Sequence, residues 1–237
     1  SKRYGVSQTN ALLSKPDPNR AERRWALALF VLTCITVFAV RLFRWQPEVT
    51  IPFWEAVGSS ALFAVALMGI LVAHEMGHFW AAKVHRFSIS LPWFLPFPLL
   101  IGTLGALIRF RDKPPNRGAL LEMAAAGPLS GMATVILVLV GWMSLGPHVP
   151  TNDDGLELAV PGVFYVVHYL IDGNAPVGVS AYDPLGFAAW IGCLITSINL
   201  LPFGQLDGGH IVFALFPSKA RIIGWLVTGL LLVGGIF

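Results

Sequence analysis

A long stretch without a single cation constrains the fold of this chain more than any other feature of its sequence. Residues 118–218 contain no lysine or arginine, and the apolar residues come in long uninterrupted blocks. Over all 237 residues, 55% are hydrophobic and 12% are charged, against roughly 25% charged in soluble proteins. A bilayer core requires roughly 20 apolar residues for each helical span, so the blocks provide several spans. The sequence therefore predicts a polytopic membrane protein and argues against a soluble one.

The apolar blocks predict an all-α fold with about five transmembrane helices. Arg41 and Arg44 end the first span, and we expect both to snorkel to the membrane surface. Residues 1–20 form a polar cytoplasmic tail in this interpretation, and residues 21–237 form a single membrane-embedded domain. The apolar piece 162–171 is expected to lie along the surface. The expected spans cover about 25 to 41 or 44, 52 or 56 to 84, 119–145, 184–200 (broken at Pro202 and Gly204, then resuming from Asp207 towards Phe216) and 221–237.

Residues 87–111 differ from the flanking blocks, because they contain several prolines, two glycines and no helical period. The end of this segment, 105–110, alternates loosely and is β-prone, which predicts a short hairpin or sheet between the second and third spans. Irregular backbone cannot face lipid with its hydrogen-bonding groups unpaired. We therefore expect a re-entrant β element that is buried against the helices.

The distribution of charge distinguishes the two sides of the predicted membrane. Cations precede the first span, lie between the second and third spans, and precede the last span. Residues 147–183, by contrast, contain several acidic residues and no lysine or arginine. This alternation follows the positive-inside rule and places the N-terminus in the cytoplasm. It also accounts for the net charge of +3, so we expect no nucleic-acid partner.

The second apolar block contains the motif His74-Glu75-Met76-Gly77-His78. On a helix, positions i and i+4 lie on one face, so both imidazoles can reach one zinc ion, with Glu75 beside the open coordination position. Two histidines and a carboxylate within a membrane are costly to bury and are rarely present without a function. The motif therefore predicts a metal site, and a hydrogen-bonded cluster for helix packing is the structural alternative.

Catalytic zinc usually has three protein ligands and one water, so a third ligand is required. Asp207 is the strongest candidate, because it follows a helix break at Pro202 and Gly204 and precedes two glycines that allow close backbone approach. Alternatively, Asp207 caps the helix that follows it, with its carboxylate accepting from the N–H of Gly209 or His210.

Three motifs in this order resemble the site-2 protease family, the intramembrane zinc metalloproteases of M50 type. The motifs are HEMGH at 74–78, AGPLSG at 126–131 and NLLPFGQLDGGH at 199–210. The stretch GTLGALIRFRDKPPNRGALLEMAAAGPLSG at 102–131 is particularly similar to the branch that includes the chloroplast EGY-type proteins and their bacterial relatives. The resemblance covers about 55–235, with the catalytic core at about 56–217.

The resemblance implies one Zn²⁺ per chain, bound by His74, His78 and Asp207. Glu75 is then the general base that activates water, and the second catalytic residue is Asn199. We expect Asn199 to hydrogen-bond the substrate backbone or an oxyanion; helix packing is the alternative.

The implied activity is hydrolysis of peptide bonds within or near the transmembrane segments of other proteins, in regulated intramembrane proteolysis. The implied partners are these substrates and the lipid bilayer. The β-prone segment 105–110 holds the extended substrate by edge pairing in this interpretation, and a purely structural plug is the alternative. The expected membrane is a prokaryotic plasma membrane or, alternatively, an organelle membrane such as that of the chloroplast. Gly127 and Gly131 are expected to let two helices pack closely.

Two other functions fit parts of this pattern less well. A protease of the prenyl-peptide-processing kind needs a third ligand from a glutamate in a later helix, and the only glutamate after Glu122 is Glu157, in a loop. A zinc transporter or sensor needs several ligand sets along a path, and it has no use for Glu75.

Overall fold

The computed structural model of the chain describes residues 19–44, 51–145, 157–174 and 178–234. Within these ranges three helices are long and apolar enough to cross a membrane: α1 (Asn19–Arg44), α2 (Phe53–Val84) and α3 (Arg117–Leu145). Two further apolar helices, α5 (Pro184–Asn199) and α7 (Ala220–Gly234), are shorter, with 16 and 15 residues. The mostly helical fold is confirmed, whereas the count of five spans stays a prediction. The predicted tail at 1–20 lies almost wholly outside the described residues.

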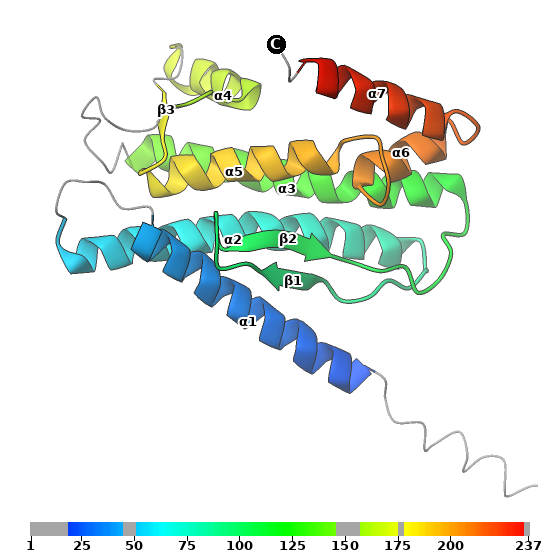
Figure 1. Cartoon of the computed structure of the whole chain (residues 1–237), viewed down its shortest axis with the longest axis horizontal. Helices are drawn as coiled ribbons and strands as arrows, with labels where there is room; N and C mark the ends of the chain where they lie inside the picture. Colours follow the sequence, from blue (N-terminus) through cyan, green and yellow to red (C-terminus); the bar gives the residue numbers. More distant parts are fainter. Residues whose placement is uncertain (1–18, 45–50, 146–156, 175–177, 235–237) are drawn as a thin grey trace, which may run out of the picture.

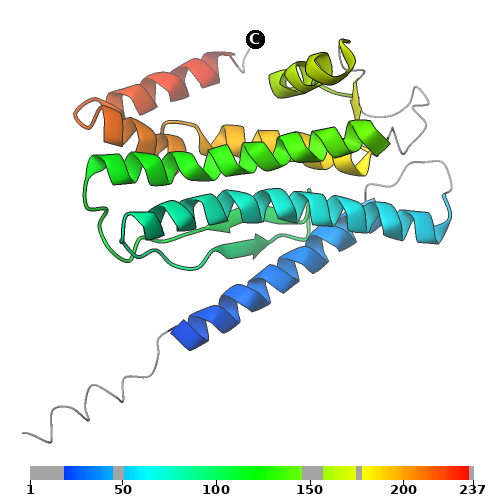
Figure 2. The ribbon, with the colours of Figure 1, turned by 180° about the vertical axis from the view of Figure 1, so that it is seen from behind.

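Helices α2 and α3 run antiparallel and side by side, and α5 packs against both of them (Figures 1 and 2). Small residues make the contact between α2 and α3 close. A Cβ added at Gly77 would lie 2.2 Å from Ser130 Oγ and 2.3 Å from the carbonyl oxygen of Ala126. Lipid is as apolar as these helices, so their association depends on van der Waals packing of this kind.

The chain turns between α5 and α6 (Asp207–Leu215), where residues 200–206 interrupt the helix as the sequence predicts. Gly204 has a φ of +63°, which glycine adopts without strain. A Cβ at Gly208 would lie 2.0 Å from the carbonyl oxygen of Leu200, so the first turn of α6 folds tightly against the end of α5. Helix α6 also packs against α3, which brings Asp207 to the α2–α3 pair.

A β-hairpin forms between α2 and α3, as predicted: β1 (Trp93–Pro96) pairs antiparallel with β2 (Thr103–Leu107). Its turn fits closely against α1, because a Cβ at Gly102 would lie 2.3 Å from the Cα of Val37. Thr36 also donates a hydrogen bond of 2.7 Å from Oγ1 to the Gly102 carbonyl. In the part of the chain that the structure describes, β2 pairs on one edge only. The hairpin lies against the helices, beside α2 in Figure 1.

Arg41 does not snorkel to the membrane surface, so this expectation is wrong. Its side chain is 1% exposed, and it donates hydrogen bonds to the carbonyl oxygens of Ala181, at 2.6 Å, and Tyr182. The guanidinium also lies over two phenylalanine rings, with its Cζ 5.2 and 5.7 Å from their centroids. These contacts offset the cost of removing the charge from water and attach α1 to the segment before α5. Arg44, in contrast, is exposed as expected.

The segment between α3 and α5 forms the short helix α4 (Gly162–Asp172) and two paired strands, β3 (Glu157–Leu158) and β4 (Val179–Ser180). The strands were not predicted. Phe164 of α4 is fully buried against Trp142 of α3, while the opposite face of α4 is exposed. The helix is half-buried on α3, and its position along the membrane surface stays a prediction.

Candidate metal centre

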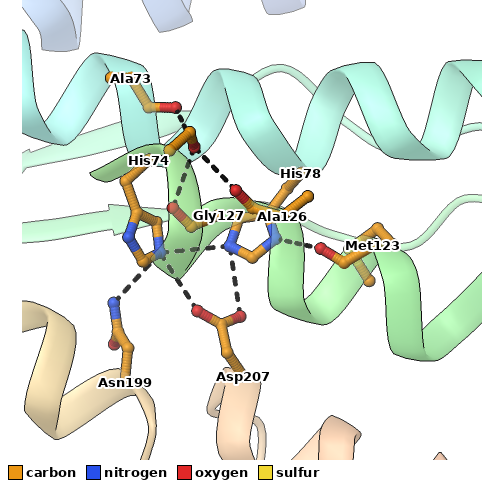
Figure 3. Close-up of polar contacts among 9 residues, drawn as sticks. Ala73, His74, His78, Met123, Ala126, Gly127, Asn199 and Asp207 are labelled. Atoms are coloured by element: carbon orange, nitrogen blue, oxygen red, sulfur yellow. Dashed lines mark hydrogen bonds and ion pairs between the residues drawn. The ribbon is translucent and has the colours of Figure 1, made fainter. Parts of the chain in front are cut away.

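The two histidines of the HEMGH motif project from α2 towards the same point, which α3, α5 and α6 surround (Figure 3). His74 and His78 are 3% and 2% exposed, and their Nε2 atoms lie 3.2 Å apart. The spacing produces this arrangement directly, because side chains four residues apart on a helix stand one above the other.

Asp207 reaches both imidazoles from the first turn of α6. Its Oδ2 lies 3.1 Å from Nε2 of His74, and its Oδ1 lies 3.3 Å from Nε2 of His78. Leu206 occupies the N-cap position of α6, and no side chain caps the helix there. The carboxylate therefore faces the histidines, and the structure gives no support to the alternative that Asp207 caps its own helix.

The separations of the two imidazole nitrogens and the carboxylate oxygens match a zinc site. With zinc–ligand distances of about 2.0–2.1 Å, tetrahedral geometry places neighbouring ligand atoms about 3.3 Å apart. The two Nε2 atoms lie 3.2 Å apart, and each has one oxygen of the Asp207 carboxylate near it, Oδ2 at 3.1 Å from His74 and Oδ1 at 3.3 Å from His78. Two imidazole nitrogens and one carboxylate oxygen also form a donor set that catalytic zinc uses, with the fourth position open to water or substrate. The residues therefore fit one zinc ion.

The carbonyl oxygen of Met123 fixes the orientation of the His78 ring. Nδ1 of His78 donates a hydrogen bond of 2.8 Å to this oxygen, so the neutral ring has its lone pair on Nε2. That lone pair faces the Asp207 carboxylate, which is also an acceptor, and a cation between them removes the repulsion. Metal-bound histidines usually donate their other N–H to a carbonyl or carboxylate in this way.

The two other residues singled out from the sequence lie in the same cluster. Glu75 is buried on α2 and interacts electrostatically with both histidines and with Asp207. Asn199 is the last residue of α5, and its Nδ2 lies 3.4 Å from Nε2 of His74. Three separate helices thus bring the five predicted residues together.

Two glycines of α3 make room for the imidazole rings. A Cβ at Gly127 would lie 2.0 Å from Nε2 of His78, and a Cβ at Gly131 would lie 3.1 Å from Nδ1 of His74. The sequence predicted a packing role between helices for both glycines. Their closest contacts are with the candidate ligands on α2, so the same glycines that allow α3 to approach α2 also shape the metal centre.

Ser130 and Met123 were missed by reasoning from the sequence. Oγ of Ser130 lies 2.8 Å from the carbonyl oxygen of Ala73, the residue before His74, and so links α3 to α2 at the metal centre. The position of Ser130 within the AGPLSG motif could have indicated it. No pattern could have indicated Met123, because it acts through its backbone.

His210 does not belong to the three-ligand group. Its ring contacts Phe110 edge-on, with centroids 5.3 Å apart. It also lines a cavity of about 540 Å³ that residues of α6, α7 and the preceding loop enclose.

Comparison with known proteins supports the family resemblance that the three motifs indicate. Residues 62–233 match the sequence profile of Peptidase family M50. The chain is 35% identical over 187 residues to "Probable zinc metalloprotease EGY2, chloroplastic" of Oryza sativa subsp. indica, an overlap of 75% of this chain and 33% of that protein. It is 31% identical over 203 residues to "Probable zinc metalloprotease EGY1, chloroplastic" of Arabidopsis thaliana, an overlap of 79% and 36%.

A third relative, "Probable zinc metallopeptidase EGY3, chloroplastic" of Arabidopsis thaliana, is 29% identical over 228 residues, an overlap of 89% of this chain and 39% of that protein. The chain therefore spans only 33–39% of the length of these curated relatives. No solved structure matches it.

Proposed function

Because the chain belongs to peptidase family M50, we propose that it is a zinc metalloprotease that cuts other membrane proteins within or near their transmembrane segments, in regulated intramembrane proteolysis. Two of the relatives are named as probable zinc metalloproteases, and these names support zinc-dependent hydrolysis of peptide bonds as the reaction. The observation that carries the proposal is the convergence of His74, His78 and Asp207 within an apolar helical bundle, where the two ring nitrogens lie 3.2 Å apart and each lies 3.1–3.3 Å from an oxygen of the carboxylate.

The proposed chemistry assigns separate roles to the ligands and to Glu75. Zinc held by the three ligands would activate a water molecule and polarise the scissile carbonyl group. Glu75 takes the proton from the attacking water and passes it to the leaving amine as the C–N bond breaks. Glu75 is buried and interacts electrostatically with both histidines and with Asp207, so its carboxylate would lie near a metal that these residues hold.

Asn199 is proposed to stabilise charge on the substrate. Its Nδ2 group already lies at the metal centre, 3.4 Å from a ligand nitrogen of His74. A rotation of the side chain lets the same N–H donate to a carbonyl oxygen on which negative charge develops. Prepositioned donors of this kind act strongly where water is excluded.

The edge of β2 is proposed to bind the substrate in an extended conformation. A peptide bond inside an intact helix is shielded, so the substrate has to unwind before it is cut. In the described residues β2 has a second edge without a partner strand, and Leu104 and Leu107 of this strand are exposed. An extended peptide can add to such an edge as a third strand.

The proposed location is an organelle membrane such as that of the chloroplast. The relatives are described as chloroplastic, which supports this alternative, whereas nothing in the comparisons supports a prokaryotic plasma membrane. Along α2, His78 and His74 lie roughly 8 and 14 Å from Lys83 at a rise of 1.5 Å per residue. We propose that water reaches the metal from this cation-rich side.

A reconstituted cleavage assay tests the function. The purified chain in proteoliposomes is incubated with a panel of single-span membrane proteins, and fragments are identified by mass spectrometry. Cleavage should stop when a chelator removes the metal and should return with added zinc. Cleavage that continues in metal-free protein would exclude a metalloprotease. Zinc flux across the same vesicles, with no cleavage of any substrate, would favour a transporter.

A further inference from the structure

A pocket lined by cations and apolar residues lies at the end of α2, and none of the three candidate metal ligands lines it. It has a volume of about 320 Å³ and is bordered by the first turns of α1, the last turns of α2 and the segment that follows α2. Three cations line it, and no acidic residue does. The lining consists of Arg23, Phe79, Ala82, Lys83, Phe87, Ser88, Ile89, Leu91 and Arg111.

The positive charge of this pocket is only partly neutralised by the protein. Arg111 forms an ion pair with Glu22, which also accepts a hydrogen bond from the N–H of Leu91. Neither Arg23 nor Lys83 has an acidic partner among the residues that the structure describes; Lys83 lies over the ring of Trp80, 5.2 Å from its centroid. Two cations are therefore available to an anion.

Two exposed tryptophans lie beside the pocket, a composition typical of the membrane surface. Trp25 and Trp80 are within three residues of the two available cations and are 65% and 61% exposed. Tryptophan is enriched where the bilayer meets water, because its ring is amphipathic. The floor of the pocket is apolar, with Phe87 and Ile89 buried. A cationic rim above an apolar floor suits a molecule with an anionic head and an apolar tail.

We propose that this pocket binds the phosphate headgroup of an anionic phospholipid, with Arg23 and Lys83 at the phosphate and the first part of an acyl chain on the apolar floor. Basic pockets between membrane helices on the cation-rich side recognise anionic headgroups. The bound lipid would bridge α1 and α2, because Arg23 and Lys83 come from different helices. Phe79 lines the pocket and directly follows His78, so the lipid would lie against the last turns of the helix that carries both histidines.

Lipid binding by the purified full chain tests this proposal without any assumption about protease activity. Native mass spectrometry in detergent compares phosphatidylglycerol with phosphatidylcholine of the same acyl chains. We expect the wild type to prefer phosphatidylglycerol, and the double variant Arg23→Gln/Lys83→Gln to bind it roughly 25-fold more weakly, about fivefold for each cation. The matched control Arg24→Gln/Arg117→Gln removes two exposed cations outside the pocket and should change binding less than about twofold.

Three outcomes would overturn the proposal. Equal weakening in both double variants would show diffuse attraction to the surface instead of a site. Displacement of phosphatidylglycerol by an equal concentration of inorganic phosphate would identify a free anion as the ligand. The variant Arg23→Lys/Lys83→Arg keeps both charges, so loss of binding in this variant, with helical content unchanged, would exclude charge recognition by these residues.

Discussion

Asp207 and His74 are 133 residues apart in sequence, yet the carboxylate Oδ2 of one lies 3.1 Å from Nε2 of the other. The contact exists because α6 begins immediately after a helix break and packs against α3, beside the HEMGH turn of α2. Two segments, neither of which can bind a catalytic metal alone, form one site.

Replacement of Asp207 should therefore abolish metal binding. In Asp207→Ala only two protein ligands remain, and we expect the zinc content to fall from about one ion per chain to near zero. Elemental analysis of protein purified without added zinc measures this. Asp172→Ala removes an exposed carboxylate at the end of α4 and should retain the metal. Full zinc occupancy in Asp207→Ala would remove Asp207 from the site.

Glu75→Gln should abolish cleavage while the protein keeps its fold and its zinc. Glutamine has nearly the same shape but cannot take a proton from water, so we expect kcat to fall by at least about 100-fold. Glu55→Gln, in the exposed first turn of the same helix, is the matched control and should be fully active. Activity above a few per cent in Glu75→Gln would assign the base to another residue.

Substitutions of the α3 glycines should weaken zinc binding more, the closer the added methyl group lies to a histidine ring. Gly127→Ala places a methyl group 2.0 Å from Nε2 of His78 and should weaken zinc binding at least tenfold, whereas Gly131→Ala, at 3.1 Å from His74, should have a smaller effect. Gly141→Ala has no atom within 4 Å of the new methyl group and should bind zinc normally. Competition with a chromogenic chelator gives the affinities. Identical affinities in all three variants would limit these glycines to helix packing.

Asn199→Ala separates a catalytic contribution from a packing role. Loss of a donor to the developing oxyanion should lower kcat by about 100-fold and leave KM and zinc content nearly unchanged. A packing defect would instead lower the melting temperature and affect both kinetic constants. Ser197→Ala, an exposed position on the same helix, is the control. Wild-type kcat in Asn199→Ala would refute the proposed role.

The orientation of the bundle can be tested with single cysteines. Lys113 lies before α3, and Asn174 lies after α4, which packs on the far end of α3 through Trp142 and Phe164. On a background with Cys34 and Cys193 replaced by alanine, Lys113→Cys and Asn174→Cys should react with an impermeant maleimide from opposite sides. Lys113→Cys should react on the side of the N-terminal cations. Labelling of both positions from one side would contradict a membrane-spanning α3.

The sequence by itself determined the features that depend on local spacing. Apolar blocks predicted where α2 and α3 lie, and the i, i+4 spacing placed His74 and His78 on one face of a helix. Pro202 and Gly204 predicted the break before Asp207 because their backbone preferences are intrinsic to the residues.

Only the tertiary structure decided how these elements meet. The sequence predicts that Arg41 snorkels to the membrane surface. The packing of α1 instead lets its guanidinium donate hydrogen bonds to two carbonyl oxygens just before α5. The Met123 carbonyl that orients His78, and the absence of a Cβ at Gly127 that admits its ring, depend on how α2 and α3 are rotated and shifted against each other. Spacing along one helix is set by its own geometry, whereas a contact between helices is set by the packing of every side chain between them, which no single segment encodes.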